Sequence, residues 1–594
     1  MPMNRQWQHV TASLVRPYRP AAVLAAGVPL PAAQAAAAAD GAARATGRPA
    51  VLLAGSGAEL NAMLPVLVMA DADSVPLVVL VRGGTAADLE AGRERAGALP
   101  DTLRLTEPFT GWNTRVDRPE DVQPVLEAAF TDLARRRPRP LLIELADEAL
   151  PRWAADPPAG TGAGDAPLPG DTAFPHLLGD GDEPGAAGRT AADTAAEAAA
   201  GIPGAATAAA GRGRRPAAEE EGEDGFRPAG GPTGNGAVIP FPGRRDEHGR
   251  PGEPAVDRRW LDQVAAALVR CRQPAIVAGG GAAGAGESLR RLAEHLGAPV
   301  FLTLAGRGLL PAGHPLAVNG LAAAPARRWL EEADVVLVVG TSLSPAEHGD
   351  LDLKGRVIQV DRDAERLGRN VPVWMALPGD AAPALAALVR RVEVEMARPV
   401  GPEAYLGATG PEQRRRAVAR LQDELAAETA QAGAAGGDGA WLATLEPRLT
   451  AADPDALSVA EAAILPVTGA RSLLLPVRLG VAGYAIPAAW GAARATGRPA
   501  RAVTTAAGLW NAGAVLPWIA PLAVDLEILV RLDRGDEGGA GEEAQGAGHP
   551  GDRPGPASVA EFFRRAAPAL NLHWDEPGWG AGVPAARLRP AGAR

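Results

Sequence analysis

The sequence is poor in two residue types. Among its 594 residues there is one cysteine, Cys271, and one lysine, Lys354, so nearly every cation is an arginine. A single thiol excludes an internal disulfide framework and is typical of a reducing compartment, so we expect a cytoplasmic protein. The preference for arginine, together with 72 glycines and 56 prolines, indicates a GC-rich genome, and we infer no function from it.

Two further absences narrow the function. No stretch offers ~20 uninterrupted apolar residues, which argues against a membrane span. No basic stripe is present, and the net charge of −11 with a pI near 5.4 argues against nucleic acid as the main partner. The hydrophobic content of 47% is enough to bury several cores, so we expect two to four domains.

One segment of the sequence occurs twice. The letters GAARATGRPA stand at 41–50 and again at 491–500. The first copy continues into VLLAGSGAELNAMLPVLVMADADSVPLVVLVR, and the second, after Arg501, into AVTTAAGLWNAGAVLPWIAPLAVDLEILVR. Each copy predicts an alanine-rich helix, a glycine break, a buried strand, an apolar helix and a second strand. Two similar α/β units therefore bracket a different middle.

Composition divides the rest of the chain. A long segment of Gly, Pro, Ala and charge holds too little apolar surface to offset the entropy of ordering, so we predict a disordered insert. Beyond it, strands alternate with helices, which predicts a doubly wound parallel sheet. We therefore predict three doubly wound α/β domains and a long insert. The bounds are 1–152 (first domain), 153–255 (insert), 256–398 (central domain), 399–534 (third domain) and 535–594 (low-complexity segment and helix/strand tail).

This order of units resembles the thiamine-diphosphate-dependent family of acetolactate synthase and the 2-oxo-acid decarboxylases. The similar stretches are DGAARATGRPAVLLAGSG, TEPFTGWNTRVDRPEDVQPVLEAAF, PAIVAGGG, LTLAGRGLLPAGHPL, VIQVDRDAERLGRN and LGVAGYAIPAAWGAA. The resemblance implies pyrimidine-binding-like, central Rossmann-like and diphosphate-binding-like domains. It also implies decarboxylation of a 2-oxo acid, or formation of a carbon–carbon bond, on thiamine diphosphate. The family builds each cofactor cleft from two chains, which implies at least a dimer.

The two residues on which the family's chemistry depends are replaced here. The activating glutamate lies eight residues before the pair equivalent to Asp40-Gly41, which puts Ala32 at its position. No Asp or Glu precedes Asp40, so no shift of register restores the carboxylate. Ala507 stands where the family places a Mg²⁺-binding aspartate, and Asp533 is the remaining candidate metal ligand. One carboxylate is a weak magnesium site.

Other candidate residues have an ordinary structural alternative. Glycines could bring backbone close to a phosphate, or they could form tight turns. Asp361 could bond a ribose or cap a helix beginning at Ala364. Glu461 stands where some relatives have an active-site glutamate, or faces solvent; Glu59 lies in a turn that meets the dianionic cofactor in the family. We expect Trp510 to fill space that a cofactor would occupy. The candidate glycines are Gly480, Gly483 and Gly508 in the third domain and Gly279, Gly280 and Gly281 in the central domain.

Two functions of different classes follow. The first is a thiamine-diphosphate-dependent carboligase or decarboxylase that uses unusual residues or a partner chain. The second is a non-catalytic relative, acting as a homodimer or tetramer or together with an active paralogue. Loss of both anchors favours the second and counts against binding of thiamine diphosphate and Mg²⁺. The resemblance to acetolactate synthase leaves FAD, or another nucleotide, as a candidate ligand of the central domain.

Overall fold

The computed structural model describes most of the predicted α/β regions. The described residues are 14–25, 30–85, 99, 101–149, 258–344 (except 312, 320 and 322), 351–398, 409–434, 456–460, 473–474, 480–516, 524–531, 556–570, 572–575 and 585–590. The predicted insert at 153–255 lies outside them. Contacts divide the chain into two compact units, which we describe separately. The first holds the described residues up to 149 and from 433 onwards, and the second holds 258–432.

The first sheet belongs to the first unit and is wholly parallel. Its strand order is β1-β2-β3-β5-β4, with bounds β1 Val23–Ala25, β2 Ala50–Ala54, β3 Leu77–Gly84, β4 Asn113–Val116 and β5 Leu141–Ala146. The main connecting helices are α2 (Ala32–Thr46), α3 (Gly57–Asp73), α5 (Thr102–Thr106) and α6 (Pro119–Arg135). Because α2 and α3 cover one face and α6 the other, strands β2 and β5 are buried along their whole length.

The second unit contains a six-stranded parallel sheet. The order is β11-β10-β9-β6-β7-β8, with bounds β6 Pro274–Ala278, β7 Val300–Leu302, β8 Ala317–Asn319, β9 Val335–Val339, β10 Arg356–Asp361 and β11 Met375–Pro378. The helices are α9 (Arg258–Arg270), α10 (Gly286–Leu296), α11 (Ala324–Glu332), α13 (Ala381–Met396) and α14 (Pro411–Ala434). Alternate residues of each strand face two separate cores, which is the doubly wound arrangement expected of this region.

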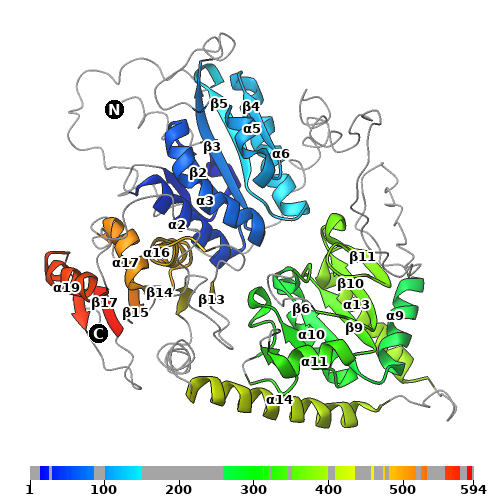
Figure 1. Cartoon of the computed structure of the whole chain (residues 1–594). Helices are drawn as coiled ribbons and strands as arrows, with labels where there is room; N and C mark the ends of the chain where they lie inside the picture. The colour runs from blue at the N-terminus through cyan, green and yellow to red at the C-terminus, as the bar shows by residue number, and fades with distance from the viewer. Residues whose placement is uncertain are drawn as a thin grey trace, which may run out of the picture. The chain divides into compact units, whose positions relative to one another are not determined.

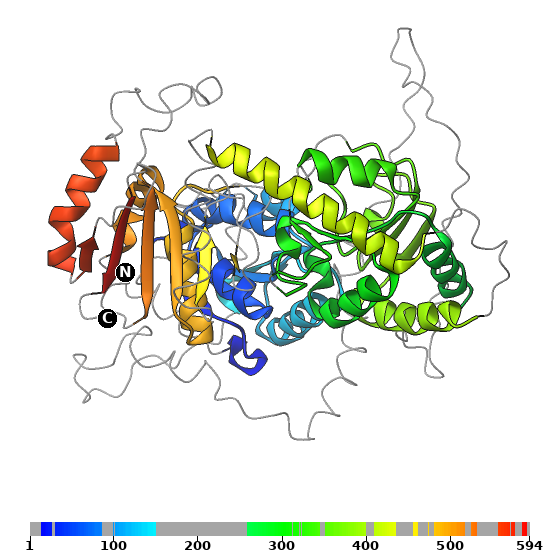
Figure 2. The same ribbon diagram turned by 90° about the horizontal axis from the view of Figure 1, so that it is seen from below.

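The third sheet belongs to the first unit. Its order is β13-β12-β14-β15-β17-β16, with bounds β12 Leu457–Ala460, β13 Leu473–Leu474, β14 Ala500–Thr505, β15 Leu526–Arg531, β16 Leu572–Asp575 and β17 Ala585–Pro590. The helices are α16 (Ala485–Thr496), α17 (Ala506–Ala512) and α19 (Pro556–Ala566). Figure 2 shows these strands in yellow to red. Strand β17 is antiparallel to both neighbours. Connection 576–584 is shorter than a parallel crossover needs, which accounts for its pairing with β16.

The two copies of the repeated segment meet inside the first unit, where α2 lies against α16 (Figure 1). A Cβ atom placed on Gly41 would lie 2.1 Å from the carbonyl oxygen of Ala488, and one on Gly491 would lie 2.0 Å from that of Ala38. These two contacts are equivalent, because each joins the same pair of repeat positions. The helices therefore pack backbone to backbone with local two-fold symmetry, at a distance that only glycine allows.

Candidate functional site

The position of the family's activating glutamate is the first residue of α2. Ala32 begins this helix after Pro31, which makes no side-chain cap to it. The Ala32 side chain is half-buried and packs against the core shared by the first and third sheets. No carboxylate precedes it in the sequence, and its methyl group cannot hydrogen-bond an aminopyrimidine.

The neighbouring turn of the first domain is closed by its own side chains. The Ser56 hydroxyl accepts a hydrogen bond from Glu59 N at 3.2 Å, and Glu59 Oε2 accepts one from Gly55 N at 2.7 Å. This arrangement resembles a capping box at the start of α3, except that Glu59 reaches the N–H of the residue before the N-cap. The Ser-x-x-Glu spacing is the sequence signal for it, and it assigns Glu59 a structural role that the sequence analysis missed.

The third-domain half of the expected site lies at the start of α16. Gly480 is exposed, whereas Gly483 is buried and has a φ of +84°. A Cβ atom on Gly483 would lie 3.1 Å from Ala512 N, at the end of α17. Both the backbone conformation and this close approach require glycine here, so the tight-turn interpretation accounts for Gly483 without a phosphate.

The loop that should carry the metal ligand joins β14 to α17. Thr505 caps α17, because its hydroxyl accepts a hydrogen bond from Gly508 N at 3.1 Å. Ala507 is exposed in the first helical turn and offers no side-chain oxygen. Trp510 is 43% exposed and meets Phe562 edge to face, so the expectation that it fills a buried cofactor space is wrong for this chain. Gly508 is buried at the cap and its N–H is already engaged.

The two half-sites lie at opposite ends of the helix pair. Ala38 meets Gly491 and Gly41 meets Ala488, so the residue numbers run in opposite directions along the two helices. Ala32 lies about 9 Å before Ala38 at 1.5 Å per residue, towards the C-terminal end of α16. Gly483 precedes the other end of α16. The crossing therefore holds the two half-sites apart within one chain.

A buried polar network crosses this helix pair. Asp40 Oδ2 accepts hydrogen bonds from Arg44 Nε at 2.6 Å and from the Tyr484 hydroxyl at 2.5 Å. Arg44 also donates to Asp73 Oδ2 at 2.9 Å. Burial and the nearby Asp40 carboxylate raise the pKa of Tyr484 well above its ordinary value, so the phenol remains a donor. No sequence pattern pointed to this network, because Tyr484 lies 444 positions from Asp40.

The glycine-rich turn of the central domain lies at the switch point between β6 and β9, where such sheets bind ligands. Gly279 N donates to Val339 O at 2.9 Å, and Gly281 N donates to Gly340 O at 3.0 Å. A Cβ atom on Gly279 would meet Thr341 at 2.6 Å, and one on Gly280 would meet Ala305 at 3.1 Å. The close packing of three loops therefore accounts for these glycines, and two of their N–H groups are unavailable to a phosphate.

The acidic residue at the end of β10 has a local role. Asp361 Oδ1 accepts a hydrogen bond from Asp363 N at 2.9 Å. The expectation that Asp361 caps the next helix is wrong, because Asp363 is the N-cap residue and accepts from Glu365 N at 3.1 Å. A hydrogen bond between Asp361 and the ribose of a bound nucleotide stays a prediction.

The part of the chain that the structure describes contains no group of three His, Cys, Asp or Glu side chains placed to hold a metal ion. Asp533 and Glu461, the two carboxylates named from the sequence, lie outside the described residues. No helix among the described residues has both the length and the apolar character needed to cross a bilayer.

Comparisons with known proteins agree with the three α/β sheets. The family model "Thiamine pyrophosphate enzyme, N-terminal TPP binding domain" matches residues 31–103, and "Thiamine pyrophosphate enzyme, central domain" matches 261–388. A solved Mycobacterium smegmatis structure, described as a thiamin diphosphate-dependent enzyme, has the same fold with a TM-score of 0.55 at 18% identity. It covers 87% of this chain and 86% of that one.

Two named relatives in other organisms are similar in sequence over much of the chain. "Probable 2-ketoarginine decarboxylase" of Pseudomonas aeruginosa is 29% identical over 465 residues, covering 76% of this chain and 65% of that protein. "Probable acetolactate synthase large subunit" of Methanocaldococcus jannaschii is 25% identical over 352 residues, covering 58% of this chain and 46% of that protein. The chain thus spans less than two thirds of the length of these relatives.

The fold and the matched domains define a thiamine-diphosphate type of architecture. The matched domain models, the relatives and the shared fold together support a thiamine-diphosphate-dependent family for this chain.

Proposed function

We propose that this chain is a family member that has lost cofactor-dependent catalysis and serves as a non-catalytic partner in an oligomer. The observation that carries the proposal is Ala507. It stands, exposed, in the turn that supplies the family's metal-binding aspartate, and it has no oxygen to give. Magnesium needs several oxygen ligands to link a diphosphate to the protein. Ala507 supplies none, so the described residues do not fit thiamine diphosphate with Mg²⁺.

The first-domain half-site supports the same proposal. Ala32 cannot accept or donate a hydrogen bond, so it could not start proton removal from the cofactor. Each substitution alone would leave the other half of the machinery in place. With the glutamate and the aspartate both lost, the chain would retain the family's fold and its contacts in an oligomer.

The crossing of α2 and α16 supports the proposal of a partner chain. Because Ala32 and Gly483 lie at opposite ends of the α2–α16 pair, one chain cannot bring its own half-sites together around one cofactor. For the family's cleft to form, a second chain would have to face each of them. That chain is either another copy, giving two degenerate clefts, or an active paralogue, whose metal-binding domain would then face Ala32.

A turnover assay tests this proposal. Purified chain with thiamine diphosphate and Mg²⁺ should release no CO₂ from pyruvate or from 2-ketoarginine above a no-protein blank. An active relative run in parallel shows that the assay works. Sustained turnover that scales with protein concentration would contradict the proposal.

A second candidate, an active 2-oxo-acid decarboxylase, is favoured by one observation. The similarity to the 2-ketoarginine decarboxylase extends over 465 residues, which is 76% of this chain. If this reading holds, Asp533 or a carboxylate of a partner chain supplies the missing metal ligand. An Asp533→Ala variant would then lose turnover, whereas the same change at the exposed Asp525 would not.

A further inference from the structure

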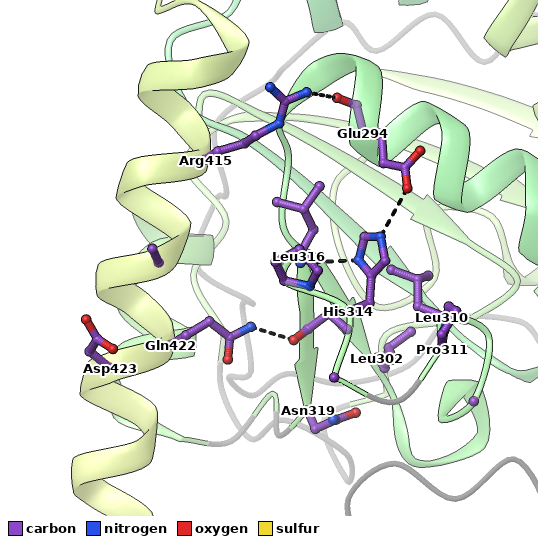
Figure 3. A pocket seen from close by; sticks show the side chains of 15 residues that line it. Glu294, Leu302, Leu310, Pro311, His314, Leu316, Asn319, Arg415, Gln422 and Asp423 are labelled. Carbon is purple, nitrogen blue, oxygen red and sulfur yellow. Dashed lines mark hydrogen bonds and ion pairs between the residues drawn. The ribbon is translucent and has the colours of Figure 1, made fainter.

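The second unit contains a cavity of about 760 Å³ whose lining includes none of the candidate cofactor residues named above. Its walls are α14 on one side and, on the other, strands β7 and β8 with the loop between them (Figure 3). Leu302, Leu310 and Leu316 supply apolar lining. This volume suits a small organic molecule, whose pockets span roughly 300–1,000 Å³.

One wall of the cavity is fixed by a buried arginine. Arg414, 4% exposed, donates to the carbonyl oxygens of Leu296 at 3.0 Å and Val269 at 3.1 Å, and also to that of Cys271. These carbonyls belong to the C-terminal ends of α10 and α9, where helices carry unpaired acceptors and partial negative charge. Arg414 thereby holds α14 against both helices, so the cavity is a built feature of this unit.

The other charged side chains of the lining have partners, whereas Asp423 on α14 is exposed to solvent. Glu294 accepts from Arg290 at 2.7 and 2.9 Å, and its backbone carbonyl accepts from Arg415 at 2.6 Å. His314 Nδ1 accepts from Leu316 N at 3.3 Å, so its proton sits on Nε2, which faces Glu294 Oε1 at 3.2 Å. An incoming charge would have to compete with these pairs. The lining therefore selects a neutral occupant.

Two carboxamides remain with unused capacity. Gln422 Nε2 donates to Ala317 O at 2.6 Å, which turns its Oε1 outward as an acceptor. Asn319 ends β8 on the cavity lining, and its Oδ1 is buried with no hydrogen-bond partner among the described residues. A buried amide oxygen without a hydrogen bond is unfavourable. A ligand that donates a hydrogen bond to Asn319 Oδ1 therefore gains binding energy.

We propose that this cavity binds a neutral small molecule carrying a carboxamide or lactam group on an apolar body. An amide edge offers a donor beside an acceptor, which matches the Asn319 side chain whichever way it is turned. The apolar body would lie on the three leucines. Because α14 forms one wall, an occupant would strengthen the attachment of that helix to the sheet.

The test uses four matched probes with the full chain, titrated by ligand-observed NMR. Benzamide has the neutral amide, acetophenone lacks the N–H, and benzoate and benzamidine carry opposite charges. Benzamide should bind with a dissociation constant on the order of millimolar, as expected for so small a ligand. It should bind at least fivefold tighter than each of the others.

Three variants locate the site. Ala419→Phe fills the cavity from an exposed position of α14 and should weaken benzamide at least tenfold. Ala427→Phe, exposed on the same helix but outside the lining, should change it less than twofold. Asn319→Leu should remove the preference for benzamide over acetophenone. Equal binding to the native chain and Ala419→Phe would overturn the proposal, as would tighter binding of a charged probe or no binding by any probe.

Discussion

The hydroxyl of Tyr484 donates a 2.5 Å hydrogen bond to the buried carboxylate of Asp40, joining residues 444 positions apart. Asp40 lies just before the first copy of the repeated segment, and Tyr484 lies just before the helix that holds the second. This bond and the salt bridge from Arg44 to the same carboxylate place a charged group inside an otherwise apolar helix interface. The interface is therefore specified by a polar contact as well as by shape.

Removing the Tyr484 hydroxyl should destabilise this interface. Tyr484→Phe leaves Asp40 buried with one donor fewer, which should lower the free energy of unfolding of the first unit by about 1–3 kcal/mol. Urea denaturation followed by tryptophan fluorescence measures it. Tyr18→Phe is the control, because Tyr18 bonds Gln123 at the surface and should cost less than about 1 kcal/mol. Equal effects of the two changes would contradict the assigned role.

Gly491 should tolerate no side chain. Its added Cβ would lie 2.0 Å from Ala38 O, so Gly491→Ala must push the two helices apart. We expect a loss of at least about 2 kcal/mol in the free energy of unfolding, the cost of overpacking a core. Gly410→Ala, where nothing lies within 4 Å, is the matched control and should be nearly neutral. Thermal unfolding of both variants decides the matter, and a native-like Gly491→Ala would refute the close packing.

Local patterns predicted much of the fold. The apolar spacing favours helices at 324–332 and 287–296, and the structure has α11 at Ala324–Glu332 and α10 at Gly286–Leu296. The apolar run at 335–339 forms the buried strand β9, because a parallel sheet covered on both faces needs continuous apolar sequence. The repeat predicted two similar α/β units, and α2 with α16 confirms it.

Contacts between distant segments could not be predicted in this way. The Asp40–Tyr484 bond, the carbonyl contacts of Arg414 and the antiparallel strand β17 all depend on which elements become neighbours. Sequence spacing carries no such information for a single chain. The exposure of Trp510 was missed for a related reason, since a lone tryptophan is as compatible with a surface pair as with a core.

Cys271 should be unreactive in the folded chain. Its thiol is 5% exposed and burial raises its pKa to about 12, so the reactive thiolate is scarce. Because the folded pKa lies above the ordinary value of 9.0, the thiol's contribution to stability is complete below pH 9 and is lost between pH 9 and 12. Labelling with Ellman's reagent at pH 8 should need urea to proceed. Rapid labelling of the native chain would contradict this.

The chain should form at least a dimer. The two half-sites at opposite ends of the helix crossing each leave a face that a second chain would cover, as the repeat symmetry suggests. Size-exclusion chromatography with light scattering at micromolar concentration should give at least twice the chain mass of 60.6 kDa. Repeating it at high salt serves as a check on charge-driven association. A monomer throughout the concentration range would speak against this assembly.

Titration calorimetry with thiamine diphosphate tests most directly whether the degenerate cofactor site still binds its cofactor. With Mg²⁺ present, the account predicts no saturable heat, because Ala507 offers no ligand and Ala32 no hydrogen bond. The same titration with a catalytically active relative confirms the reagents. Saturable binding with micromolar affinity, followed by CO₂ release from pyruvate, would contradict the account.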